Sequence, residues 1–531
     1  MEADELKKKS NLESLLDEIL AKSIKPQDMY EIAALLESIG WNDKRASQTF
    51  GVQDIFELAE VLWNMMKGRA SFESYVGEEK VGIATSFMII VKSFLRGMIF
   101  ALPMGISVIA MLTLRFSLWS YENLSTELAT CIAIGTILSF MSIGGFTQAI
   151  ARRGFFYINQ GYYNMAKRVT YYFLKLGYLF CAIIALAFFV FNLFFEIFPT
   201  NLMIVILVFY MFLSSIWLAV TVMYILKREF TFTALITAGI GIVFIFFKIF
   251  NFNILVSQVI ALLFISILGL FLVIYFFNQA EKRMEKGISP ELPRNSIMLY
   301  SLMPFFIYGF LYFTFLFADR VISWSTNDVF MPYLIWFRGG YELGLDFALL
   351  MMIIPLGISE VIVSRLMVRL ENAQKNSLSH DIETLNKKYL NLYSRSLITV
   401  SIVSAISGIL IFLALILLRN GYGPSIINKA LLSNNVMFFV FIFALISYAV
   451  LSVALTNVIV LFSLSVPDLV TKAILRSLII NVIVGFLLTR WIGYQYAVFG
   501  LLAGSIFFMI YSTICVIKVL RNLDYYIYAA L

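Results

Sequence analysis

Long apolar runs dominate this sequence and constrain its fold more than any other feature. From about residue 84 onward, they alternate with short polar loops. An α-helix rises about 1.5 Å per residue, so about 20 apolar residues cross a bilayer core. The twelve predicted spans are residues 86–115, 128–150, 171–196, 202–225, 231–250, 254–277, 297–318, 346–365, 396–418, 435–462, 469–489 and 494–518. We therefore predict an all-α polytopic membrane protein with about 12 transmembrane helices.

The composition excludes several classes of protein. Of the 531 residues, 61% are hydrophobic and 14% are charged, which is too apolar for a soluble domain of this length. The three cysteines fall inside apolar runs and the one histidine, His380, lies in a polar loop, so we expect neither a disulfide framework nor a metal site. The glycine pair at residues 144–145 does not continue into a phosphate-binding loop. We therefore predict no enzyme activity and no cofactor. We also predict no cleaved signal peptide, because the N-terminus lacks an apolar segment.

The charge divides the chain into two chemically different pieces. Residues 1–80 hold 16 acidic and 10 basic residues, whereas the remainder holds 17 acidic and 30 basic residues. We interpret residues 1–80 as an acidic helical cytoplasmic module. Its function is either docking of a partner or mechanical support of the first membrane helix.

The module shows helical periodicity in short pieces. Leucine and isoleucine share one face of residues 11–20, and Pro26 begins a second helix that Gly40 ends. Asn42 is placed to cap a third helix, and Gly51 separates that helix from residues 52–66. We predict three or four helices.

Orientation and internal symmetry follow from the loops. Basic residues concentrate in alternate loops, which predicts that both termini are cytoplasmic. A basic linker at 278–296 divides the membrane body into an N-terminal six-helix lobe (84–277) and a C-terminal six-helix lobe with a tail (297–531). Each lobe begins with a helix that carries a proline, Pro103 and Pro304. A further proline break, at residues 354–357, requires neighbours that satisfy the freed backbone groups.

Charged and aromatic residues cluster after the seventh span. The apolar run 305–318 meets Asp319 and Arg320, and Trp324, Tyr341 and Asp346 follow. We expect these residues at the outer mouth of a substrate pathway, as substrate contacts or as a latch of the outward gate. The alternative is that Asp319 and Arg320 form an interfacial ion pair that only anchors the helix. Trp324, Tyr341 and Trp336 are also candidates for sugar stacking, although such rings are common at membrane interfaces.

Five cations are candidates for a cytoplasmic vestibule that attracts an anionic substrate. They are Lys92, Arg96, Arg152, Arg153 and Lys175. The alternative for each is that it extends to lipid phosphates and obeys the positive-inside rule. Among the five, Lys92 and Lys175 are the strongest candidates for the pathway.

Glu360 lies inside the eighth span and is the candidate for ion coupling. A buried carboxylate there would take up a proton or a sodium ion, or would pair with Arg365. Gln258, Asn457 and Asn481 also lie inside spans, where such residues usually bridge helices by hydrogen bonds.

Four short segments resemble Pel-type exopolysaccharide exporters. They are residues 215–230, 317–324 (Phe-Ala-Asp-Arg-Val-Ile-Ser-Trp), 341–346 (Tyr-Glu-Leu-Gly-Leu-Asp) and 521–525 (Arg-Asn-Leu-Asp-Tyr). The resemblance implies the multidrug/oligosaccharidyl-lipid/polysaccharide (MOP) flippase superfamily, with two six-helix lobes that face each other across a central cavity in the bacterial inner membrane. Asp319, Arg320, Trp324 and Tyr341 are the family-like positions. The chain departs from the pattern in its acidic module and in Arg320, where the family has lysine.

The predicted function is an inner-membrane flippase or exporter that moves a polysaccharide or lipid-linked glycan by alternating access. Expected partners are membrane lipids, the glycan and a cytoplasmic glycosyltransferase or polymerase, without nucleic acid. One alternative is an ion-coupled multidrug antiporter of the same superfamily, which needs buried acidic residues in the lobes. Another is a membrane scaffold whose acidic module recruits a polysaccharide synthase.

Overall fold

The computed structural model consists of helices joined by short non-helical segments in the part of the chain that it describes. That part comprises residues 12–19, 28–70, 88, 91, 93–95, 97–98, 102–282, 293–327, 331–376, 382–420, 433–523 and 525–526. Within it, the only β pairing is an isolated bridge between Phe116 and Tyr121. The chain divides into two compact units, Met1–Ile89 and Ile90–Leu531.

The first unit is a small helical bundle with its own core. Residues 12–19 are helical, and α2 (Met29–Ser38), α3 (Asp43–Phe50) and α4 (Ile55–Ala70) follow. The core includes Leu16, Leu36 and Leu62, all fully buried. These helices confirm the predicted bundle, whereas the predicted start at Pro26 lies outside the described residues.

Two predicted helix ends of this unit are confirmed in detail. The Asn42 side chain accepts a hydrogen bond from the Arg45 amide at 2.9 Å and caps α3. Gly51 ends the same helix in the left-handed region, at φ 65°, which glycine adopts without steric cost.

Among its described residues, the second unit contains eleven helices that are long and apolar enough to cross a membrane. They correspond one by one to the second to twelfth predicted spans. The helices are α7 (Thr126–Asn159), α8 (Tyr163–Phe195), α9 (Thr200–Ile225), α10 (Glu229–Phe244) continued by a π-helical turn (Ile245–Ile249), α11 (Ile254–Glu281), α12 (Asn295–Trp324), α13 (Gly339–Leu349) continued by a 3₁₀ turn (Leu350–Met352) and α14 (Ile353–Asn376), α15 (Ile382–Arg419), α17 (Asn435–Ser463), α18 (Pro467–Trp491), and α19 (Val498–Arg521) preceded by a 3₁₀ turn (Tyr494–Ala497). In the first predicted span, the described positions between 88 and 98 are helical, and α6 (Leu102–Leu114) follows.

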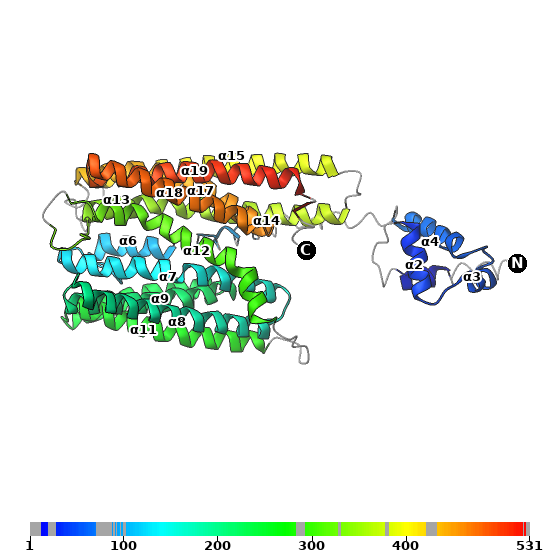
Figure 1. The fold of residues 1–531 in the computed structure, drawn as a ribbon, viewed down its shortest axis with the longest axis horizontal. Helices are drawn as coiled ribbons and strands as arrows, with labels where there is room; N and C mark the ends of the chain where they lie inside the picture. Colours follow the sequence, from blue (N-terminus) through cyan, green and yellow to red (C-terminus); the bar gives the residue numbers. More distant parts are fainter. Residues whose placement is uncertain are drawn as a thin grey trace. The chain divides into compact units, whose positions relative to one another are not determined.

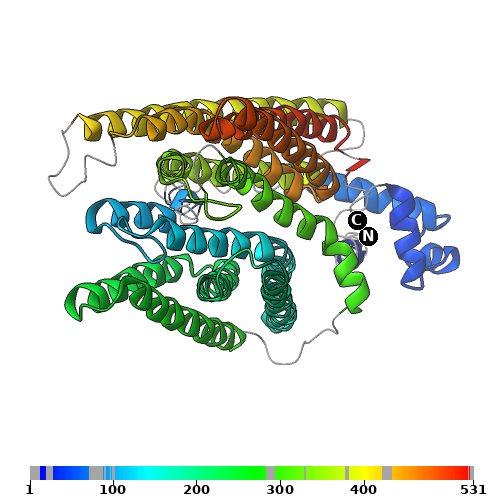
Figure 2. The ribbon, with the colours of Figure 1, turned by 60° about the vertical axis from the view of Figure 1, so that its left-hand side comes forward.

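The helices group into two lobes (Figures 1 and 2). In the first lobe, α7 packs on α8 and α9, and α9 packs on α11. In the second lobe, α17, α18 and α19 pack together, and α12 and α13 lie against them. Figure 2 shows α12 running between the orange and red helices of the second lobe and the cyan and green helices of the first. The predicted linker is shorter than expected, because α11 continues to Glu281 and α12 begins at Asn295.

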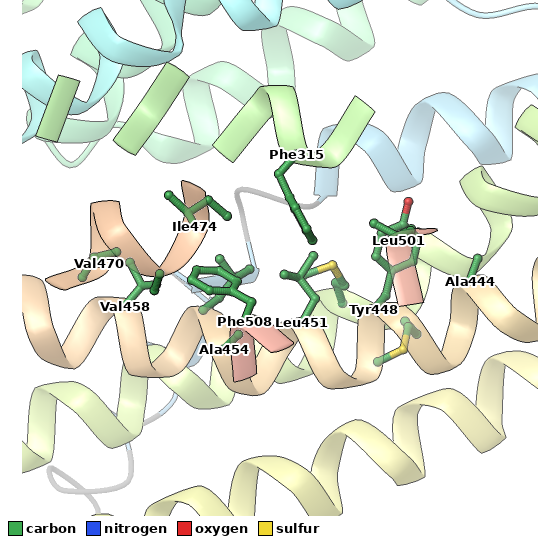
Figure 3. Packing of buried hydrophobic residues seen from close by; sticks show 14 of the residues in the cluster. Phe315, Ala444, Tyr448, Leu451, Ala454, Val458, Val470, Ile474, Leu501 and Phe508 are labelled. Atoms are coloured by element: carbon green, nitrogen blue, oxygen red, sulfur yellow. The ribbon is translucent and has the colours of Figure 1, made fainter. Parts of the chain in front are cut away.

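Buried aromatic and aliphatic side chains hold the second lobe together (Figure 3). Phe315 of α12 points toward Leu451 of α17 and lies 6.2 Å, ring to ring, from Phe508 of α19. All three side chains are fully buried, so this core fixes α12 to the second lobe.

The backbone carbonyl that the proline break in the eighth span leaves without a donor is hydrogen-bonded by a neighbouring helix, as expected from the sequence. Pro355 has no amide hydrogen, so the Met351 carbonyl, four residues earlier, lacks its helical donor. The Ser407 hydroxyl of α15 donates to that carbonyl at 2.7 Å. A 3₁₀ turn, Leu350–Met352, accommodates the break.

The lobes meet where α7 and α12 cross. A Cβ atom on Gly144 would lie 2.5 Å from the Gly309 carbonyl oxygen, and a Cβ atom on Gly309 would overlap the Gly144 carbonyl. The two backbones are therefore in direct contact, which only glycine permits.

Candidate functional site

A buried ionic cluster lies inside the second lobe, centred on Arg320 of α12. Its guanidinium donates to the Glu342 carboxylate of α13 and, at 3.2 Å, to Asp346 one helical turn further on. Trp324 Nε1 donates to the other Glu342 oxygen at 2.8 Å. Arg320 and Glu342 are 7% and 6% exposed, so this pair is removed from water.

Asp319 and Arg320 do not pair with each other. Consecutive helical side chains point about 100° apart, because a helix has 3.6 residues per turn. Asp319, with no exposed surface, accepts a hydrogen bond from the Tyr341 hydroxyl at 2.7 Å. The predicted interfacial ion pair is therefore wrong, and both side chains are buried inside the lobe.

The cluster holds more carboxylates than cations. Glu342 and Asp346 pair with the one guanidinium, and Asp319 is a third carboxylate without a cation of its own among the described residues. Asp319 Oδ1 and Arg320 Nε have no hydrogen-bond partner within the same residues. Asp346 has 35% of its side chain exposed and keeps contact with solvent. A buried cluster with excess negative charge favours uptake of a proton or a small cation.

Two cavities lie between the lobes and meet at Arg320. The larger, of about 770 Å³, extends toward the Asn159 end of α7, and the smaller, of about 300 Å³, extends toward its Thr126 end. We call them the inner and outer cavities. Arg152 and Arg320 line the inner cavity, and no carboxylate does so among the described residues. Glu342 and Asp346 line the outer cavity together with Glu122.

Aromatic rings separate the two cavities. Trp119, Phe140 and Phe317 line both of them. The Phe140 ring lies 5.5 Å from the Phe317 ring and 4.6 Å from the Trp217 ring, centroid to centroid. The Arg320 guanidinium carbon lies 5.5 Å from the centre of the Phe317 ring. We call Trp119, Phe140 and Phe317 the aromatic partition.

The loop before α7 presents Trp119 to the cavities in a fixed position. Gln258 of α11 donates from its amide to the carbonyl oxygens of Ser117 and Ser120, at 3.3 and 3.2 Å. Leu118 between them is fully buried. Gln258 therefore joins α11 to a loop, whereas the sequence analysis expected it to bridge two helices.

The predicted vestibule cations have different surroundings. Arg152 lines the inner cavity. Arg153 lies over Phe156 and Tyr157 of its own helix, at 5.1 and 5.4 Å. Lys175 is exposed on α8 and lines neither cavity, so its place in the pathway stays a prediction. The preceding residue, Leu174, occupies the buried face of α8 instead. Lys92 and Arg96 lie outside the described residues.

Two of the three predicted sugar-stacking residues are buried in the ionic cluster. Trp324 is 1% exposed and Tyr341 has no exposed surface, and both donate hydrogen bonds inside the cluster. Trp324 also lines the outer cavity. Trp336 lines neither cavity. The two tryptophans that line the inner cavity, Trp119 and Trp217, were missed. Trp217 carried a signal, because a tryptophan in mid-span lies away from the interfaces that this residue usually occupies.

Glu342 was also missed as a site residue, although the sequence places it beside Tyr341. Glu360, the predicted coupling residue, is half-buried on α14. Its Cβ lies 3.0 Å from where a Cβ atom of Gly97 would stand, so the first span packs against this part of α14. Glu360 lines neither cavity.

Comparison with known proteins establishes the fold. No protein-family model and no curated protein matches the chain. A mutant of the Vibrio cholerae MATE transporter VcmN is similar, with a TM-score of 0.56 and 14% identity, over 83% of this chain and 97% of that one. The eukaryotic MATE transporter AtDTX14 gives a TM-score of 0.55 and 12% identity, over 83% and 97%. An outward-facing multidrug resistance MATE family transporter of the MOP superfamily gives 0.55 and 12%, over 82% and 96%.

The chain therefore has the fold of these MATE transporters, and the predicted all-α architecture of two membrane lobes is confirmed. The similarity to Pel-type exporters stays a prediction.

Proposed function

We propose that this protein of MATE fold is a membrane transporter that moves a polysaccharide or lipid-linked glycan outward by alternating access. The observation that carries the proposal is the inner cavity, which lies between the lobes and ends at the aromatic partition. Its volume of about 770 Å³ falls within the range of small-molecule sites, so it holds a headgroup with one or two sugars rather than a polymer. A polymer would pass through in segments. A cavity between two lobes also argues against the scaffold alternative.

The lining supports a substrate that combines an anionic group with apolar or sugar faces. Arg152 provides positive charge in the inner cavity, which no carboxylate lines among the described residues. Trp119 and Trp217, whose rings lie 6.1 Å apart, provide aromatic surface. A phosphate-bearing lipid-linked glycan has both features.

The ionic cluster favours a second candidate, an ion-coupled multidrug antiporter. Such a transporter needs buried carboxylates, and the cluster supplies two of them, Asp319 and Glu342, with the half-buried Asp346 as a third carboxylate against one cation. The same cluster would serve as the coupling site of a glycan exporter. We therefore assign ion coupling to Asp319 and its neighbours in preference to Glu360.

We propose that the protein lies in a bacterial inner membrane with both termini in the cytoplasm. The basic ends of α7 and α8, with Arg152, Arg153, Lys167 and Arg168, then face the cytoplasm. The acidic first unit would lie on the same side, where a cytoplasmic glycosyltransferase or polymerase would dock.

A cavity-filling substitution tests the proposal. Thr221 of α9 lines the inner cavity, and Thr237 of α10 is exposed on the outside of the lobe. We expect Thr221→Trp to abolish surface polysaccharide in the producing cell, and the control Thr237→Trp to leave it unchanged at equal expression. Unchanged polysaccharide in both variants would contradict the glycan exporter. Loss of drug resistance alone in Thr221→Trp would favour the antiporter.

A further inference from the structure

We propose that Arg152 is a conformational latch that joins the two lobes at the inner end of α7. Arg152 belongs to the first lobe, and its guanidinium donates to the Phe462 carbonyl at 3.3 Å and to the Ser465 hydroxyl at 2.7 Å, both in the second lobe. These acceptors lie at the C-terminal end of α17. Arg152 is thus a positioning residue for the lobes, and not only a cation of the inner cavity.

The position of the acceptors strengthens this contact. The last carbonyls of a helix carry the negative end of the helix dipole, so an arginine there is favourable. The Phe462 carbonyl accepts from the Arg152 guanidinium in addition to the Ser465 amide, which lies at 3.0 Å. The Arg152 guanidinium carbon also lies 5.1 Å from the centre of the Phe305 ring on α12. One side chain of the first lobe therefore contacts two helices of the second.

Ser465 supplies an independent observation. Its backbone has φ 59°, in the left-handed region where glycine is the usual residue after a helix. A serine in this conformation is strained, and its hydroxyl is the group that accepts from Arg152. The strained residue is explained if the hydroxyl is needed for the contact between lobes.

A second contact between lobes lies toward the other end of α7. The Phe337 amide, from the segment before α13, donates to the Thr130 hydroxyl at 3.1 Å. The crossing of Gly144 and Gly309 lies between the two contacts. Along α7, Gly144 stands about 12 Å from Arg152 and about 21 Å from Thr130, at 1.5 Å per residue.

α7 therefore makes one hydrogen-bonded contact with the second lobe on each side of the glycine crossing. If the lobes rock about the crossing, separation at the inner end breaks the Arg152 contacts and leaves the Thr130 contact in place. Separation at the outer end does the reverse. The latch rests on the proposed alternating-access function, because only lobes that move need a releasable contact.

Spin-label distances in the full chain in lipid nanodiscs test the latch. One label pair, Asn159→Cys with Asp468→Cys, reports the inner end, and a second, Glu127→Cys with Leu334→Cys, reports the outer end. All four positions are exposed, whereas the three native cysteines are buried and stay unlabelled.

The variants separate a latch from a structural role. Ser465→Gly removes the acceptor and relieves the backbone strain, so a purely structural role predicts an unchanged or more stable protein with wild-type distances. If Arg152 is a latch, both Ser465→Gly and Arg152→Gln lose a charge-assisted hydrogen bond. We then expect the population with a long distance between the inner labels to rise roughly tenfold relative to the population with a short distance. Arg153→Gln is the matched control, because Arg153 lies over rings of its own helix.

Two results would overturn the proposal. One is an inner distance distribution in Arg152→Gln and Ser465→Gly that equals that of Arg153→Gln. The other is an equal widening at both ends, which would indicate general loosening of the lobes. The readout needs no substrate, so a shift without glycan transport would refute the proposed function and leave the latch standing.

Discussion

Removing the positive charge of Arg320 is the most informative single perturbation of the ionic cluster. Arg320→Gln keeps a polar side chain of similar reach but leaves Glu342 without a cation. Glu342 then retains only the hydrogen bond from Trp324.

The size of the expected effect follows from burial. Removing one partner of a buried ion pair costs about 3–5 kcal/mol, because the remaining charge is left uncompensated. The Arg320–Glu342 pair meets this condition, since both side chains are 8% exposed. The Arg320–Asp346 pair adds little, about 0–1 kcal/mol, because Asp346 is 35% exposed and keeps its water. The expected loss is therefore about 3–5 kcal/mol, nearly all of it from Glu342.

The free energy of unfolding in mixed micelles, titrated with a denaturing detergent, measures this loss. Arg490→Gln is the control, because Arg490 is exposed and makes surface contacts with the Ser325 hydroxyl at 3.0 Å and with the Phe486 ring of its own helix at 4.9 Å. Arg320→Gln combined with Glu342→Gln removes both charges of the pair. We expect this double variant to recover most of the stability, since neutral replacements of buried ion pairs are often tolerated.

Either of two results would refute the reasoning. The first is a loss of stability in Arg320→Gln no larger than that in Arg490→Gln. The second is a double variant as unstable as the sum of its single substitutions, because additivity would mean that Arg320 and Glu342 do not interact.

Three further predictions concern other contacts. Tyr341→Phe leaves the Asp319 carboxylate without its hydroxyl donor, and we expect a loss of about 1–3 kcal/mol in the same unfolding titration. Gly309→Ala places a methyl group on the Gly144 carbonyl, and we expect a loss of about 1–3 kcal/mol from overpacking of the crossing. Asn42→Ala removes the cap of α3, and we expect faster hydrogen exchange of the amide three residues later, with about 1 kcal/mol lost locally.

Controls are available within the chain for two of these predictions. Gly241 of α10 has open space where a Cβ atom would stand, so Gly241→Ala is expected to be neutral or stabilising. Tyr511→Phe provides the tyrosine control, because that ring only stacks on Phe507 at 5.9 Å and lies under Arg476. Equal losses in a control and in its test variant would contradict the corresponding argument.

Residues of the site were identified more reliably than their contacts. Asp319, Arg320, Trp324, Tyr341 and Asp346 were all selected from the sequence, and all five take part in the cluster. Their partners were not predicted, because α12 and α13 meet only after both have packed on the rest of the second lobe. Proximity in the sequence did not predict which side chains form hydrogen bonds or ion pairs. Asp319 accepts from Tyr341, whereas the adjacent Arg320 pairs with Glu342.

The apolar spans and the capped helices of the first unit were determined by the sequence alone. Each depends on a continuous segment, since a span must satisfy its own backbone in hydrocarbon and a cap joins residues three apart. The direction that each charged side chain faces was decided only by the tertiary structure. Lys175 faces outward because its buried neighbour Leu174 sets the rotation of α8. Arg152 donates to the Phe462 carbonyl and the Ser465 hydroxyl, 310 and 313 residues away in the sequence, because the two lobes pack against each other. No local sequence pattern predicts this contact.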